Sequence, residues 1–292
     1  MISAASAART PRATPGIGVS YWQWSPTYGN TIAGTDNQVA VLKPMVIRIG
    51  GYNNDANTPD TFDNAQLDKA VAYARAIGAE PILQVPLLAA DSKGTAATPD
   101  TAAAMVTYAN VTANYGIKYF SIGNEPDLYP DATGTTKGIA NYKPADFCTS
   151  AVAYVKAMKA VDPAIKILGP ELSWKYQTGA NDWLTTILQT CGSSIDIVTV
   201  HRYPIDPAKA TVAAAEADAA NLDNTINHLR AIMKQAGVDD KPLAKLGTTN
   251  ELALDSTPEH LRRPDLVVIR RVRDDIINTE ISRNHTIEQT TL

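Results

Sequence analysis

Residues 117–127 read IKYFSIGNEPD, and this stretch joins a short apolar run to a polar turn that carries a carboxylate. The apolar run is able to form a strand that is buried on both faces, as strands of a parallel sheet are. Glu125 comes three residues after Ile122, the last apolar residue of the run. The stretch therefore predicts a buried strand with an acidic residue just beyond its carboxyl end.

Similar apolar runs recur along the chain, 29 to 48 residues apart, which leaves room each time for a helix and two loops. They start near Ile17, Val46, Pro81, Ile117, Ile165, Ile195 and Leu243. Seven strand–helix units in series predict a parallel sheet with right-handed crossovers. A barrel explains seven or eight such units better than an open sheet does. We therefore expect an α/β fold, a (β/α)8 TIM barrel, and the sequence lacks the Gly-x-Gly-x-x-Gly turn of a dinucleotide-binding fold.

The segments between these runs show the spacing of amphipathic helices. Apolar residues recur every three or four positions from Leu67 to Ile77, from Phe147 to Met158 and from Leu222 to Met233. A further helix is expected from about Thr101 to Asn114. Glycines or a proline follow these stretches and are typical helix stops.

Length and composition limit the class of protein. A chain of 292 residues exceeds the roughly 250 of one (β/α)8 barrel but is too short for two ordinary domains. With 45% hydrophobic and 19% charged residues it can bury a large core. A net charge of −4 gives no reason to expect nucleic acid or an anionic membrane as partner, and no stretch approaches the roughly 20 apolar residues of a membrane span.

Both ends of the chain differ from the barrel region, which we place at residues 16–257. Residues 1–15 are rich in Ala, Ser and Pro, lack the apolar core of a signal peptide, and are expected to be a flexible segment. This leaves the localisation open, with a secreted origin among the options. Residues 258–292 hold six arginines, as many as the preceding 257 residues together. We interpret this tail as atypical, with 266–269 able to serve as an eighth strand or the whole as a charged surface helix.

The two cysteines, Cys148 and Cys191, have no C-x-x-C spacing that would favour a zinc site. Cys148 falls in a helical pattern and is interpreted as a small core residue.

In a (β/α) barrel the active site lies at the carboxyl ends of the strands, so the residues that follow each apolar run are the candidates for chemistry. Glu125 follows the fourth run, and Glu251 follows the seventh. Two carboxylates that converge across a barrel mouth are what glycoside hydrolysis requires. One protonates the leaving oxygen, and in retaining enzymes the other, about 5–5.5 Å away, attacks the anomeric carbon. The acid must hold its proton near neutral pH, so its pKa has to be raised by burial or by the other carboxylate.

The run from Ile122 to Tyr129, with its Asn-Glu-Pro, resembles the acid/base signature of the clan A retaining glycoside hydrolases. It is most similar to the heparanase and β-glucuronidase-like branch and to the β-xylosidase-like branch. The resemblance covers about residues 16–256 and implies that Glu125 is the acid/base and Glu251 the nucleophile. It also implies that Asn124 binds the sugar 2-hydroxyl, that Arg48 supports the nucleophile, and that His201 and Tyr203 line the site.

The chain departs from the pattern of these enzymes in two places. Asn250 and Leu252 flank Glu251, where Thr-Glu or Gly-Glu followed by a polar residue is usual. No tryptophan follows Trp183, whereas the eighth strand of these enzymes commonly ends in one, and their accessory β-sandwich is absent. Both departures concern the carboxyl-terminal part of the chain.

Several aromatic residues follow the expected strands and could stack on sugar rings, although each could equally be a packing residue. The candidates for substrate stacking are Trp22, Trp24, Tyr129 and Trp174. For the polar candidates the structural alternatives are an ion pair for Arg48, a core histidine for His201, and a loop carboxylate for Glu125 or Glu251. No metal site is expected, since the sequence has only four histidines and none clusters with His201.

The sequence thus predicts a retaining O-glycosidase that cleaves β-glycosidic bonds by double displacement, acts on a carbohydrate substrate and needs no cofactor. The alternative is a catalytically impaired carbohydrate-binding barrel, because loss of a true eighth strand would leave two open sheet edges. Self-association as a homodimer is one way to cover such edges. A different barrel enzyme, such as an aldolase, is disfavoured because no lysine follows a strand in a position for Schiff-base chemistry.

Overall fold

The computed structural model describes residues 16–21, 40, 43–57, 63–89, 95–131, 138–173, 183–202, 211–245 and 266–270. At 266–270 and a few other positions within helices and strands it describes the backbone alone. Trp22, Trp24, Trp174, Tyr203 and Glu251, which the sequence analysis singles out, lie outside the described residues.

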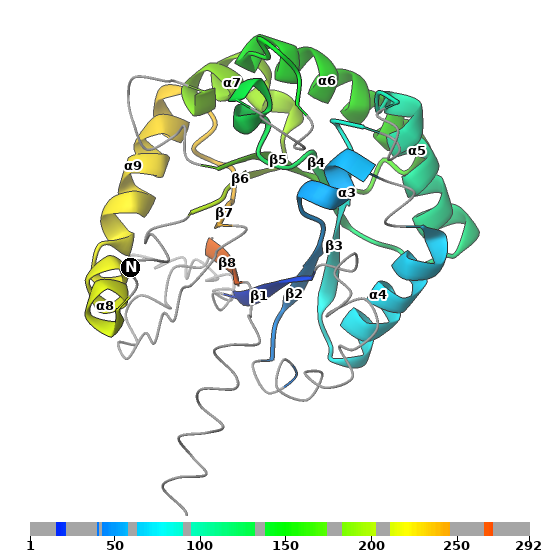
Figure 1. Ribbon diagram of the computed structural model, residues 1–292, viewed down its shortest axis with the longest axis horizontal. Coiled ribbons are helices and arrows are strands. Elements are labelled where there is room, and N and C mark those ends of the chain that lie inside the picture. The colour runs from blue at the N-terminus through cyan, green and yellow to red at the C-terminus, as the bar shows by residue number, and fades with distance from the viewer. Residues whose placement is uncertain are drawn as a thin grey trace, which may run out of the picture.

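The centre of the molecule is a curled sheet in which every neighbouring pair of strands runs parallel (Figure 1). The strands follow one another around the sheet in chain order: β1 Gly16–Tyr21, β2 Val46–Ile49, β3 Glu80–Val85, β4 Tyr119–Ile122, β5 Lys166–Leu172, β6 Ile197–Val200, β7 Leu243–Lys245 and β8 Leu266–Arg270. Because the strands are parallel and sequential, their carboxyl ends all lie at one end of the sheet, where barrel enzymes place their active sites.

The backbone of β8 pairs in parallel with both β7 and β1, so the order of the strands is that of a closed barrel. Leu266 lies beside Leu243, and Val267 lies beside Gly16. The segment that the sequence analysis offered as an eighth strand thus takes that position. The open edges that motivated an impaired barrel are therefore covered in the described backbone. The segments on either side of β8 lie outside the described residues, as does any helix that completes the eighth unit.

Helices follow most of the strands and form an arc around the sheet (Figure 1). They are α3 Tyr52–Asn57, α4 Asn64–Ala76, α5 Pro99–Val106, α6 Pro144–Val161, α7 Trp183–Cys191, α8 Val212–Ala220 and α9 Leu222–Gln235. Two short 3-10 segments, Pro126–Asp131 and Gly192–Ser194, and a π-helical turn, Thr107–Thr112, complete the described elements. Among the described residues, no helix combines the length and the apolar character that crossing a bilayer demands.

Helix α4 shows how the sequence sets an element's ends and its buried face. Asp63 caps its first turn by accepting a hydrogen bond from the Gln66 backbone N–H, and the Gln66 side chain accepts from the Asp63 N–H in return. Leu67 and Val71, at helical spacing, are buried against the sheet. Gly78 follows the helix at φ 78°, a left-handed conformation that glycine adopts without strain. The helix therefore begins and ends at residues that local chemistry selects.

The main hydrophobic core lies between the sheet and its helices, and it takes in residues of β1 to β7. Ile47, Ile49 and Leu83 have no exposed surface, as expected for strands covered on both faces. Packing of this kind holds the strands rigidly and so fixes the positions of the polar residues at their ends.

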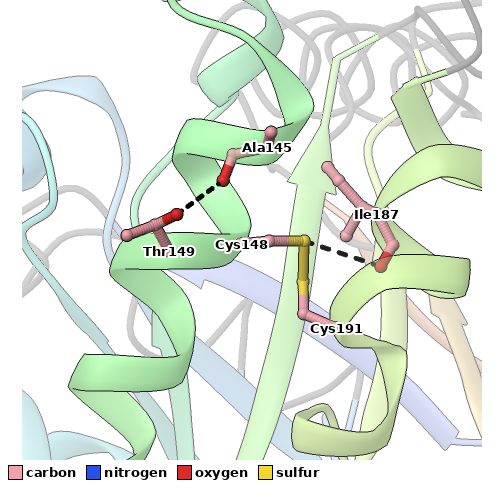
Figure 2. Close-up of a disulfide and its surroundings, with 5 residues drawn as sticks. All are labelled: Ala145, Cys148, Thr149, Ile187 and Cys191. Carbon is pink, nitrogen blue, oxygen red and sulfur yellow. Dashed lines mark hydrogen bonds between the residues drawn. A yellow bond between two sulfur atoms is a disulfide. The ribbon is translucent and has the colours of Figure 1, made fainter.

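A disulfide between Cys148 and Cys191 joins helix α6 to the end of helix α7 (Figure 2). Cys148 is buried, as the sequence analysis expected, but the interpretation of it as a simple core residue was incomplete. The two cysteines are 43 residues apart, and no short spacing in the sequence indicates their pairing. They meet because α6 and α7 pack side by side on the outside of the sheet.

Candidate active site

Six polar side chains lie at or just beyond the carboxyl ends of five consecutive strands, β2 to β6. They are Arg48, Gln84, Asn124, Glu125, Glu171 and His201. The sequence analysis named four of them as candidates, namely Arg48, Asn124, Glu125 and His201. The structure brings these four into one hydrogen-bonded group.

Arg48 is the centre of this group and is 2% exposed. Its Nη2 donates to Gln84 Oε1 and to Asn124 Oδ1, each at 2.9 Å, and it forms an ion pair with the carboxylate of Glu171. Its Nε is 3.4 Å from Glu171 Oε1. One guanidinium therefore ties together residues from β3, the end of β4, and β5, using the planar set of donors that suits a carboxylate.

Gln84, on β3, links Arg48 to the turn that follows β2. The backbone N–H of Gly51 donates to Gln84 Oε1 at 2.6 Å. A Cβ atom on Gly50 would lie 2.3 Å from the same oxygen, which is closer than any real contact. Glycine at this position thus allows the close approach of backbone and side chain that the brace needs.

Glu125 is held on a left-handed turn, with φ 52°. Its backbone N–H donates to Glu171 O at 3.1 Å, and its Oε1 lies 2.7 Å from His201 Nδ1. Its side chain is 15% exposed, whereas that of His201 is 2% exposed. A non-glycine residue in the left-handed region carries strain, which persists where surrounding contacts determine the backbone and is typical of functional sites. The turn presents the Glu125 carboxylate at the surface of an otherwise buried group.

Asp55, on helix α3, holds the backbone next to this turn through hydrogen bonds. Its carboxylate accepts hydrogen bonds from the backbone N–H groups of Leu87, Leu88 and Asn124, at 2.7, 3.2 and 3.1 Å. The Tyr129 hydroxyl donates to the same carboxylate. Burial raises the pKa of Asp55 to about 6, although these hydrogen bonds oppose the shift. The loops after β3 and β4 are thereby fastened to helix α3.

Tyr129, a candidate stacking residue, is placed away from the surface. Its ring is 3% exposed and lies 5.2 Å, centroid to centroid, from that of Tyr142. Burial raises its pKa well above 10. The ring offers no open face to a sugar in this structure, and the role that the geometry supports is packing beneath the Glu125 turn.

Glu171 is a functional candidate that the sequence analysis missed. It has no exposed surface, and it sits at φ 54° where the register of β5 against β6 shifts. Burial alone would raise its pKa, but the positive charge of Arg48 and the neighbouring His201 hold that pKa at about 2. Its signal in the sequence is a carboxylate directly after the apolar run and Gly-Pro of residues 165–170, the same position rule that identified Glu125.

His201 lies between the two carboxylates. Its Nδ1 faces Glu125 at 2.7 Å, and its Nε2 is 3.7 Å from Glu171 Oε2. Burial would lower its pKa, but Glu125 and Glu171 outweigh burial and raise it above 6.5. His201 is thus poised to carry a proton next to Glu125.

The described residues contain no group of three or more His, Cys, Asp or Glu side chains arranged to hold a metal ion. The described chemistry of the site is that of carboxylates, an imidazole, amides and a guanidinium. Such a set can donate and accept protons and can bind hydroxyl groups.

Comparison with known proteins adds a family. A family model described as "Glycosyl hydrolase catalytic core" matches residues 83–234, which include Glu125, Glu171 and His201. No curated protein matches the chain in sequence.

Several solved structures share the fold. A family 51 α-L-arabinofuranosidase, AbfB from Bifidobacterium longum, superposes with a TM-score of 0.63 at 15% identity, over 92% of this chain and 69% of its own. CelM2, a bifunctional glucanase-xylanase from a metagenome library, gives 0.65 at 13% identity, over 89% and 73%. A xyloglucanase of glycoside hydrolase family 44 from Paenibacillus polymyxa gives 0.63 at 14% identity, over 90% and 73%. At these identities the likeness establishes the fold.

Proposed function

Since the chain belongs to the glycosyl hydrolase catalytic core family, we propose that it is a retaining O-glycoside hydrolase that cleaves β-glycosidic bonds. Glu125 is its acid/base and Glu251 its nucleophile. The observation that carries this proposal is the position of Glu125. It follows β4 on a strained turn, partly exposed, with its carboxylate hydrogen-bonded to His201.

The proposed reaction takes two steps. In the first, Glu125 gives its proton to the glycosidic oxygen while a Glu251 oxygen attacks the anomeric carbon, so that the leaving group departs and a glycosyl-enzyme ester forms. In the second, Glu125 takes a proton from water, whose oxygen attacks the anomeric carbon and releases Glu251. No cofactor takes part. The sugar leaves with the configuration it had in the substrate, since each step inverts the anomeric carbon.

The other residues of the site would bind and orient the sugar. Asn124 is held by Arg48 beside Glu125, and the proposal assigns it the sugar 2-hydroxyl. His201 orients the Glu125 carboxylate. Tyr203, together with the stacking candidates Trp22, Trp24 and Trp174, would complete the sugar site from the loops around it.

Glu251 is preferred to Glu171 as the nucleophile because of burial. Glu171 has no exposed surface and is paired with Arg48, so its oxygens do not face a substrate. The resemblance assigned Arg48 to the nucleophile, but within the described residues its carboxylate partner is Glu171. Residue 251 follows β7, and in a complete (β/α)8 barrel, which we propose for the whole chain, a carboxylate there could meet Glu125 across the mouth.

The test is a screen of aryl glycosides with the wild-type chain, Glu125→Gln and Glu251→Gln. We expect turnover of at least one glycoside by wild type and a loss of several orders of magnitude in each variant. A glycoside that bears fluorine at carbon 2 and a reactive leaving group should accumulate as a covalent glycosyl-enzyme, and peptide mass mapping should find it on Glu251.

Each outcome has a clear meaning. Label on Glu171 would reverse the assignment of the nucleophile. A folded wild type that binds sugars but cleaves none would contradict the proposal and leave the chain as a carbohydrate-binding barrel. Anomeric inversion, seen by proton NMR of the first product, would exclude the double-displacement mechanism.

A further inference from the structure

Glu171 is a buried carboxylate to which the proposed reaction gives no part. It lies on β5, between the strand of Arg48 and the strand that leads to His201. It forms an ion pair with Arg48, and its Oε2 is 3.7 Å from His201 Nε2. Its main-chain oxygen accepts the backbone N–H of Glu125. Through these contacts Glu171 touches the three site residues that surround it without reaching the surface.

The position of the imidazole ring indicates how Glu171 acts. Both ring nitrogens of His201 face carboxylate oxygens, Nδ1 that of Glu125 at 2.7 Å and Nε2 that of Glu171 at 3.7 Å. An ionised carboxylate accepts hydrogen bonds and donates none. While Glu125 is ionised, as it is once it has given its proton to the leaving group, the ring has a negative charge on each side, which favours its protonated, positively charged form. At 3.7 Å Nε2 is too far from Glu171 for a hydrogen bond, so Glu171 acts on the ring through its charge.

The charges around His201 make this protonated form depend on Glu171. Glu125, Glu171 and Arg48 are the charged groups with the largest effect on the ring among the described residues. Arg48 carries a positive charge that disfavours a second one nearby. The two carboxylates together offset Arg48 and raise the pKa of His201 despite its burial. Without Glu171, the negative charge that offsets Arg48 and a protonated His201 within the described residues would come from Glu125.

We propose that Glu171 is a positioning residue, whose buried charge fixes the Arg48 guanidinium and keeps the proton on His201 that is shared with Glu125. This inference rests on the proposed function for its catalytic meaning, since a protonated His201 stabilises the ionised form of Glu125 that arises when the leaving group takes the proton. In the second step the same proton orients the Glu125 carboxylate toward the incoming water.

The first test measures the proton on His201 directly and needs no substrate. Imidazole groups can be titrated by NMR in histidine-labelled protein, and the His201 signals are identified by their loss in His201→Gln. In wild type we expect the pKa of His201 to lie above its ordinary value of 6.5. In Glu171→Gln we expect His201 to lose its proton about one pH unit lower, a tenfold fall in proton affinity, because a charge within about 4–6 Å has been removed. The matched control is Glu80→Gln, which removes a carboxylate paired with Arg75 at the surface and should leave His201 unchanged.

A second variant keeps the question answerable if Glu171→Gln does not fold. In Glu125→Gln the nearer carboxylate is lost, so His201 should release a proton at lower pH than in wild type, and the hydrogen that remains on the neutral ring should lie on Nε2, the nitrogen that faces Glu171. Imidazole nitrogen chemical shifts that place this hydrogen on Nδ1 instead would show that Glu171 does not hold a proton on the ring, and the proposal would be overturned. An unchanged His201 titration in folded Glu171→Gln would overturn it as well.

The second test follows the reaction. For Glu171→Gln we expect kcat to fall about tenfold to a hundredfold with a smaller change in KM, since the reacting groups lose their alignment. The alkaline limb of kcat/KM should move to higher pH, because Glu125 retains its proton longer when the adjacent positive charge is lost. Glu171→Asp keeps the charge, so it should restore part of the lost kcat and move the alkaline limb of kcat/KM back toward its wild-type position. If Glu171 had a merely structural role, its substitution would change the stability of the protein and leave the alkaline limb in place.

The two proposals fail in different ways. If wild type cleaves no glycoside, the proposed function fails while the NMR titration still decides the role of Glu171. If wild type is active, but Glu171→Gln changes neither the His201 titration nor the alkaline limb of kcat/KM, only the inference about Glu171 fails.

Discussion

Arg48 is a buried cation whose counter-charge comes from a strand three positions away in the barrel. Burying two charges is costly, and the attraction between them offsets that cost only while both are present. Gln84 and Asn124 satisfy further donors of the guanidinium, so the pair is part of a network rather than an isolated contact. Removing one member therefore leaves the other without compensation.

We predict that Arg48→Met lowers the free energy of unfolding by about 3–5 kcal/mol, because the buried Glu171 carboxylate then loses its arginine partner. The control is Arg75→Met, which breaks a surface pair with Glu80 in which the arginine side chain is 43% exposed. That change should cost less than about 1 kcal/mol. Urea denaturation of both variants, followed by circular dichroism, measures the difference. Equal losses would mean that burial adds nothing to the Arg48–Glu171 pair.

At the scale of single residues, the position rule for barrel strands named four of the six polar residues that make up the candidate site. It identified Arg48, Asn124, Glu125 and His201, which the structure groups together. The sequence analysis did not name Glu171, because a carboxylate that follows Gly-Pro looks like part of a turn. The burial of Glu171 also depends on Arg48, which is 123 residues away in the sequence. Such a pairing is a property of the folded chain and leaves no local pattern.

At the scale of elements, helices α6 and α7 are covalently joined by Cys148 and Cys191. Closing a loop of 43 residues removes conformational freedom from the unfolded chain, which corresponds to roughly 4 kcal/mol in the chain-entropy model. We predict that reduction lowers the midpoint of urea unfolding, with a loss of about 2–4 kcal/mol. The double variant Cys148→Ala/Cys191→Ala should unfold at that lower midpoint with or without dithiothreitol. An unchanged wild-type midpoint after verified reduction would contradict the prediction.

The strands themselves were predicted closely, and the differences have a physical cause. Val46 and Leu243 begin strands as expected, whereas Ile117, Ile165 and Ile195 come shortly before theirs. These three isoleucines are 1–2% exposed. Apolar character reports burial, which at these three positions begins before the ladder of hydrogen bonds does, so there the apolar run starts earlier than the strand.

The helix expected from about Thr101 to Asn114 begins two residues earlier, at Pro99, and divides in the structure. Helix α5 ends at Val106, and a π-helical turn continues from Thr107 to Thr112. The apolar period along the sequence does not distinguish these two forms of winding over so few residues. The side chain of Asn110 bonds to the backbone N–H and oxygen of Ile117, which ties the widened turn to the chain just before β4.

At the scale of the whole molecule, two buried carboxyl groups give the stability opposite dependences on pH. The folded-state pKa of Glu171, about 2, is below its ordinary value of 4.5. Its contribution is therefore present above pH 4.5 and is lost as the pH falls toward 2. The folded-state pKa of Asp55, about 6, is above its ordinary value of 3.8. The folded chain therefore binds that proton more tightly, and stability declines as the pH rises from about 4 to 6.

We predict that these two groups together place a stability maximum near pH 4 to 4.5, measurable as the urea midpoint between pH 2 and 7. Glu171→Gln should flatten the acid side of that curve, and Asp55→Asn should flatten the decline between pH 4 and 6. If the urea midpoint of Glu171→Gln falls as steeply below pH 4 as that of wild type, acid unfolding is caused by other carboxylates.

The cross-link between α6 and α7 also has a mechanical meaning. Glu171 lies inside the 43-residue loop that the disulfide closes, whereas Glu125 precedes the loop and His201 follows it. If the chain were pulled by its two ends, the segment from Cys148 to Cys191 could not lengthen, and the stretched chain would be shorter by roughly 150 Å than its reduced form. Strand β5, which carries the buried Glu171, lies within this segment and would therefore not be extended by the pulling force.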